Sequence, residues 1–107
     1  QSDFVKIRIN VPINDADRIR GILGKEGAGM QGNYSYCSYS YNGIGRFLPN
    51  VGAKPAIGAI GELEEVTEEL IEVICHKDLA EKVIKAVKKA HPYEEPAIDI
   101  IPRLDVV

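Results

Sequence analysis

The densest group of chemically active side chains lies in segment 91–96, which reads His-Pro-Tyr-Glu-Glu-Pro. It holds an imidazole, a phenol and two carboxylates between two prolines, and proline restricts the backbone around it. Such side chains can bind a cation, form part of a ligand site or contact another subunit. The alternative is a rigid connector between a helix and a strand, anchored by Tyr93. Local chemistry alone leaves both interpretations open.

Two other patterns favour structure over chemistry. The segment 27–32 matches GxGxxG, but a dinucleotide fingerprint follows a strand and opens a helix, whereas this one follows a predicted helix and enters a strand. We therefore predict a flexible turn. Six glutamates lie within residues 62–72, without the glycine and Asn/Asp offsets of a calcium loop. We interpret them as a solvated acidic loop and strand edge.

The two histidines are too far apart to share a metal ion within one subunit. His76 and His91 lie on either side of a predicted helix whose length, about 13 residues, corresponds to roughly 20 Å. Each could still contribute to a site across an oligomer interface.

The composition indicates one folded domain, 1–107, in the cytoplasm. The chain has 107 residues, of which 45% are hydrophobic and 27% charged, enough for one core. It has two cysteines without CxxC spacing, so neither a disulfide scaffold nor a zinc site is expected. No apolar run approaches the roughly 20 residues of a membrane helix, and the start of the sequence lacks a signal-peptide pattern. We expect no membrane partner.

Charge is unevenly distributed, with a net value of −3. Residues 1–61 contain seven Lys/Arg and four Asp/Glu, whereas residues 62–107 contain six and twelve. A nucleic-acid-binding protein needs a clustered basic face. The pattern therefore excludes nucleic acid as the expected partner.

Hydrophobic periodicity predicts the elements that position these residues. Two helices are expected. The first is capped by Asn14 or Asp15 and ends near 24–27, and the second opens at Asp78 in a near capping box. The Tyr-rich second strand should contain a β-bulge near Cys37, and a long Gly/Pro-rich loop should follow at 42–64. The four predicted strands cover residues 4–11, 33–41, 66–75 and 97–101.

The order βαββαβ is the ferredoxin-like α+β sandwich, a four-stranded antiparallel sheet with two helices on one face. The other face has no helix to cover it, and Leu70 and Ile74 would be exposed there in a monomer. We therefore expect a homo-oligomer. The predicted core residues are Val5, Ile7, Ile9, Ile19, Ile22, Leu23, Ile71, Val73, Leu79, Val83, Val87, Ile98 and Ile100.

Four segments carry a family resemblance, and the first of them contains the pattern GxGRFxP while the last reads Ala-His-Pro-Tyr-Glu-Glu-Pro-Ala. With the first strand and helix, they make nearly the whole chain similar to the PII/CutA-like module of the NGG-interacting-factor-three-like (NIF3-like, YqfO) family, here as a stand-alone chain. The segments are 43–49, 52–58, 62–72 and 90–97.

The resemblance implies both a fold and a context. In longer relatives the module is inserted in a larger domain that binds two metal ions and is labelled a type 2 GTP cyclohydrolase I homologue. This chain has no counterpart of that domain's ligand set. CutA and PII proteins form trimers with ligand sites between subunits, and PII proteins contact partners through the loop that corresponds to residues 42–64.

We therefore predict a non-enzymatic, oligomeric binding or regulatory module, with a trimer as the favoured state and no catalytic residues. A protein or small-molecule partner would bind through loop 42–64. The alternatives are a divalent-cation-binding CutA-like protein, or an accessory subunit or homologue of type 2 GTP cyclohydrolase I-like metal hydrolases. A divalent metal is the candidate cofactor, with His91, Glu94 and Glu95 as candidate ligands. The predicted ligand-binding or interface residues are Arg46, Phe47, His91, Tyr93, Glu94 and Glu95.

Overall fold

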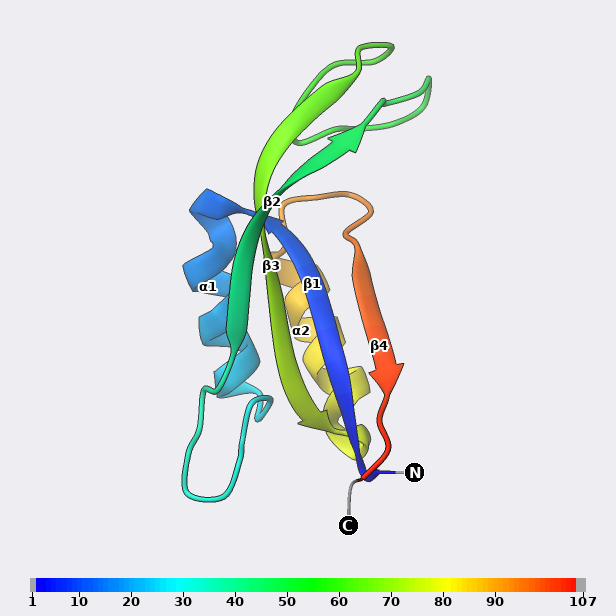
Figure 1. Cartoon of the computed structure of the whole chain (residues 1–107). Coiled ribbons are helices and arrows are strands. Elements are labelled where there is room, and N and C mark those ends of the chain that lie inside the picture. The colour runs from blue at the N-terminus through cyan, green and yellow to red at the C-terminus, as the bar shows by residue number, and fades with distance from the viewer. Residues whose placement is uncertain (1, 106–107) are drawn as a thin grey trace.

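A computed structural model describes residues 2–105 as one antiparallel sheet with two helices on one of its faces (Figure 1). The strand order is β2-β3-β1-β4. This architecture confirms the predicted ferredoxin-like α+β fold. In chain order the elements are β1 (Phe4–Pro12), α1 (Ile13–Lys25), β2 (Tyr39–Phe47), β3 (Glu64–His76), the 3₁₀ turn η1 (Lys77–Leu79), α2 (Ala80–Ala90) and β4 (Ile98–Pro102).

The core lies between the sheet and the two helices. In β1 and β3 alternate residues are buried, and the register places Ile9 opposite Ile71 and Ile7 opposite Val73. Burial of such side chains is the main stabilising term of a domain this small. Ile100 is an exception to the predicted core, because β4 is an edge strand and leaves it 48% exposed. The buried core residues are Ile7, Ile9, Val11, Ala16, Ile19, Leu23, Ala28, Ile71, Val73, Cys75, Val83 and Val87.

Both predicted helix caps are wrong. Helix α1 begins directly after Pro12, which offers no side-chain acceptor, and Asn14 and Asp15 lie inside its first turn. Asp15 instead pairs with Arg18 at 3.0 Å. Asp78 lies within η1, and α2 starts after Leu79 without a side-chain cap. A short 3₁₀ turn therefore replaces the predicted capping box.

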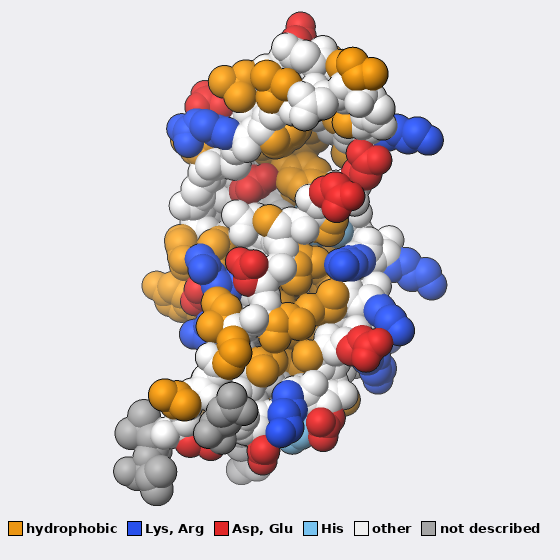
Figure 2. All heavy atoms as spheres, turned by 90° about the vertical axis from the view of Figure 1, so that its right-hand side faces the viewer, with side chains coloured by type: hydrophobic (Ala, Val, Ile, Leu, Met, Phe, Trp, Pro, Cys, Tyr) orange, Lys and Arg blue, Asp and Glu red, His pale blue; other side chains and the backbone are white. Residues whose placement is uncertain are grey.

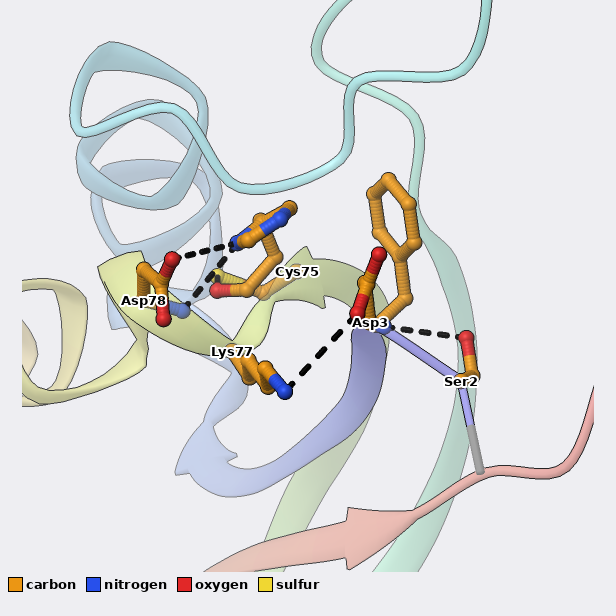
Figure 3. Close-up of polar contacts among 7 residues, drawn as sticks. Ser2, Asp3, Cys75, Lys77 and Asp78 are labelled. Carbon is orange, nitrogen blue, oxygen red and sulfur yellow. Dashed lines mark hydrogen bonds and ion pairs between the residues drawn. The ribbon is translucent and has the colours of Figure 1, made fainter.

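Polar contacts of Asp3, Lys77 and Asp78 surround the junction between β3 and η1 (Figure 3). The His76 Nδ1 accepts a hydrogen bond from the Asp78 N–H at 3.1 Å. Nearby, Lys77 forms an ion pair with Asp3 at 3.7 Å, and the backbone of Lys77 donates to the Asp3 carbonyl at 2.8 Å. Cys75 is buried here, and burial raises the pKa of its thiol. These contacts fasten the start of β1 to the end of β3.

The predicted second strand is misplaced. Residues 33–38 lie outside any strand, so the bulge predicted near Cys37 is absent, and Tyr36 has a positive φ of 59°, which departs from extended backbone. Strand β2 instead covers Tyr39–Phe47 and includes Gly43 and Gly45. The loop between β2 and β3 therefore covers residues 48–63, rather than 42–64.

Strands β2 and β3 continue beyond the end of β1 as a two-stranded ribbon, at the top of Figure 1. The last pair between β1 and β3 is Pro12 with Glu68, whereas β2 and β3 remain paired as far as Phe47 and Glu64. The ribbon consists of residues 44–47 and 64–67, and it carries loop 48–63 at its tip. Within the described part of the chain, neither helix has the length and hydrophobicity to cross a membrane.

Candidate functional site

A pocket of about 620 Å³ lies between the β2–β3 ribbon with its loop and segment 91–97, which connects α2 to β4. Figure 2 shows hydrophobic side chains beneath the overhanging end of the molecule, with acidic side chains beside them. Most of the lining is apolar or backbone. The pocket is lined by Asn10, Gly45, Arg46, Phe47, Leu48, Pro49, Asn50, Val51, Ala53, Pro55, Ala56, Ile57, Glu68, Tyr93, Glu94, Glu95 and Ala97.

A hydrogen bond between Tyr93 and Glu68 joins the two sides of the pocket. The Tyr93 hydroxyl donates to Glu68 Oε2 at 2.7 Å, and Glu68 is only 6% exposed. Burial, this hydrogen bond, and the negative charges of Glu68 and Asp15 raise the pKa of Tyr93 above its ordinary value near 10. The phenol therefore stays protonated at neutral pH and acts as a hydrogen-bond donor.

His91 anchors segment 91–97 to β1. Its Nδ1 accepts the Tyr93 N–H at 3.1 Å, so the other ring nitrogen, Nε2, carries the hydrogen and donates to the Asn10 carbonyl at 2.7 Å. Asn10 N–H in turn donates to the Ala97 carbonyl at 3.1 Å. Both nitrogens of the buried imidazole are thus engaged within the chain. His91 lies behind the pocket and positions Tyr93.

Glu94 connects segment 91–97 to loop 48–63. Its Oε1 accepts the Lys54 N–H at 3.0 Å. Next to this contact, the rings of Phe47 and Tyr93 meet edge to face, with centroids 5.8 Å apart. At the rim, Arg46 pairs with Glu65 at 2.6 Å, and both side chains are more than half exposed. The Glu94 contact holds segment 91–97 to the loop, and the Tyr93 contacts hold it to Phe47 of the ribbon and Glu68 of β3.

The structure brings together the residues predicted from two distant segments. Arg46 and Phe47 lie on the ribbon, and Tyr93, Glu94 and Glu95 lie on the connection after α2, yet all five line one pocket. His91, the sixth predicted residue, supports the pocket without lining it.

Sequence reasoning missed Glu68. The acidic run was interpreted as a solvated loop and strand edge, but Glu68 is only 6% exposed. Glu68 is buried against Tyr93, and Glu69 pairs with Arg20 of α1. Glycine in a strand marks a close approach by a neighbouring group, and Gly45 does so here, but its partner Glu68 is identified only by the structure.

The described side chains of the pocket do not form a metal centre. Among residues 2–105, no three or more His, Cys, Asp or Glu side chains are grouped as a metal site. The metal candidates His91 and Glu94 direct hydrogen-bonding atoms to backbone groups instead. Chemically, the arrangement offers an apolar cavity with a few fixed polar groups.

No family model matches the chain. The chain is 47% identical over 97 residues to a GTP cyclohydrolase 1 type 2 homolog of Bacillus subtilis, a match that covers 91% of this chain and 26% of that protein. It is 43% identical over 99 residues to a protein of the same name from Mycobacterium tuberculosis, covering 92% and 26%. The chain therefore spans about a quarter of the length of the curated relatives it matches.

Solved structures also match the chain over nearly its whole length. A Bacillus cereus protein related to NIF3 matches with a TM-score of 0.82 and 43% identity, over 95% of this chain and 26% of that one. The periplasmic divalent cation tolerance protein CutA from Archaeoglobus fulgidus matches with a TM-score of 0.71 and 23% identity, over 97% and 87%.

The fold is therefore CutA-like. Over nearly its whole length the chain matches a segment of NIF3-related proteins that makes up about a quarter of those longer chains.

Proposed function

We propose that this chain is a non-enzymatic binding module whose small-molecule ligand occupies the pocket between loop 48–63 and segment 91–97. The pocket itself carries the proposal. Its volume of about 620 Å³ lies within the usual range for small-molecule sites, which are mostly apolar with a few placed polar groups. Here the polar side chains are those of Asn10, Arg46, Asn50, Glu68, Tyr93, Glu94 and Glu95.

We propose that a partner protein senses ligand binding at the surface of loop 48–63. Leu48, Ala53 and Ile57 of the loop face the pocket, while Val51 is also 94% exposed. A ligand that packs against the loop stabilises one of its arrangements, and a partner protein that contacts the same loop senses that arrangement. The Glu94 contact with Lys54 N–H couples segment 91–97 to this surface.

A screen of nucleotides, divalent metals and small metabolites by thermal shift tests the proposal, since a ligand of the folded state raises the melting temperature. We expect stabilisation by one ligand class, and we expect Ala53→Trp to abolish it because the indole fills the pocket. Ala59→Trp is the matched control, since Ala59 lies exposed in the same loop outside the pocket. Stabilisation that survives Ala53→Trp, or no stabilisation by any class, would contradict the proposal.

We further propose that the module is a homo-oligomer, with a trimer as the expected state. The helix-free face of the sheet bears Ile74 and Leu70, which are half-buried, and the exposed rings of Tyr39 and Tyr41. Such a patch is typical of an interface. Light scattering at micromolar concentration should give about three subunits, and Ile74→Asp should reduce the mass to one. Lys85→Asp on the outer surface of α2 is the control, and a monomeric wild-type chain would refute the interface.

The alternative is an accessory role beside a metal-dependent hydrolase domain. Its support is the 47% identity to a segment of a protein named a GTP cyclohydrolase 1 type 2 homolog. Inclusion of GTP in the screen distinguishes this role, because stabilisation by GTP that survives Ala53→Trp would favour it over a ligand in the pocket.

A further inference from the structure

We infer that the ligand of this pocket carries a cationic nitrogen on an apolar body, and that the Glu68 carboxylate binds the cation. The inference rests on the proposed function and assigns the chemical class of the ligand.

The charges around the pocket favour a cation. Glu68, Glu94 and Glu95 contribute three carboxylates to the lining, and Arg46 contributes a single positive charge. That arginine is already paired with Glu65, which lies outside the lining. An anionic ligand such as a phosphate would therefore meet an excess of like charge, whereas a cation would be attracted.

Glu68 is the one acidic group in the lining that is more than nine-tenths buried. Its Oε2 accepts the Tyr93 hydroxyl, and no ion pair within residues 2–105 compensates its charge. A carboxylate has two oxygens with about four acceptor positions, so capacity remains for a further donor. A buried anion without a positive partner is unfavourable, and an ammonium or guanidinium ligand supplies that partner.

The surroundings of Glu68 suit an organic cation better than a metal ion. The described residues hold no group of three potential metal ligands. The rings of Phe47 and Tyr93 lie in the same lining, and aromatic faces attract organic cations. Apolar side chains of the loop, among them Leu48 and Ile57, provide surface for the body of the ligand.

Three probes of similar shape test the inference: 4-phenylbutylamine, 4-phenylbutanol and 4-phenylbutyrate, which are cationic, neutral and anionic at pH 7. Calorimetric titration of the whole chain should show that the amine binds about tenfold more tightly than the alcohol, the size expected for a charge-assisted hydrogen bond. The carboxylate probe should bind most weakly. Amide shifts of Gly45 and Tyr93 in NMR spectra should locate the bound amine.

Glu68→Gln keeps the shape of the side chain and removes its charge, so it should reduce the preference for the amine to about twofold or less. Glu62→Gln, an exposed loop residue outside the pocket, should leave the preference unchanged. Circular dichroism verifies the fold of both variants. Should Glu68→Gln fail to fold, the comparison of amine and alcohol on the wild-type chain, with its NMR footprint, still decides the inference.

Equal binding of amine and alcohol, or no binding of all three probes, would overturn the inference. A preference for the amine that persists in Glu68→Gln would overturn the assignment to Glu68. A different result would refute the proposed function: that no ligand of any class binds the chain and loses its binding in Ala53→Trp. A nucleotide that binds while the amine does not would refute the cation and leave the binding module intact.

Discussion

Replacement of Ile71 by alanine should lower the free energy of unfolding by about 2–5 kcal/mol. Ile71 is fully buried in β3, opposite Ile9 of β1 and Ser40 of β2. Truncation removes buried apolar surface and leaves a cavity that the interior of a sheet cannot easily close. A loss of this size is a large fraction of the stability of a small domain. Urea denaturation followed by circular dichroism measures it.

Ile44→Ala is the matched control, since Ile44 lies on β2 in the ribbon and is 57% exposed. Its effect should stay within about 0.5 kcal/mol. Similar losses for both variants would show that the ribbon is packed against something else, such as a second subunit. A small loss for Ile71→Ala would contradict the placement of the core.

The elements with strong periodicity were predictable. Residues 4–11 alternate, and the structure places β1 at Phe4–Pro12; residues 66–75 lie within β3, Glu64–His76. The side chains that face the helices are apolar along β1 and at Ile71, Val73 and Cys75 of β3, so pattern and burial agree there. The element order and the fold class follow from these segments together with the two helical ones.

Strand β2 was not predictable by the same reasoning. Its residues Asn42, Gly43 and Gly45 resemble a turn, because asparagine and glycine are depleted in strands, and the tyrosines before it resemble a strand. Gly45 is instead explained by a tertiary contact, because the Glu68 side chain lies where its Cβ would be. Local propensity contains no information on such a contact.

Only part of the candidate site was predictable, because one of its contacts also depends on how the strands pair. Proline and aromatic residues marked segment 91–96, and the structure places it opposite Arg46 and Phe47. The partner of Tyr93 depends on the register between β2 and β3, which pairs Gly43 with Glu68. One acidic residue among six therefore became a buried member of the pocket, while its neighbours remained in ion pairs or solvent.

The difference between Gly43 and Gly45 gives the second large effect. A Cβ at Gly45 would overlap the Glu68 carboxylate, whereas one at Gly43 would meet nothing within 4 Å. Neither residue has a positive φ, so alanine is compatible with both backbones. Gly43→Ala should therefore raise stability by roughly 0.5–1 kcal/mol, through the lower conformational entropy of its unfolded chain.

Gly45→Ala should lower stability by about 1–3 kcal/mol, because the new methyl group displaces a buried carboxylate from the hydroxyl that satisfies it. If this hydrogen bond is the cause, the loss should be smaller in a Tyr93→Phe background, where the bond is already absent. Urea denaturation of the four variants of this cycle measures the coupling. Equal effects of alanine at 43 and 45 would show that Glu68 moves aside freely, and additive losses would show that Gly45 acts independently of Tyr93. A coupling of more than about 0.5 kcal/mol would establish that Gly45, Glu68 and Tyr93 act as one unit holding the ribbon to segment 91–97.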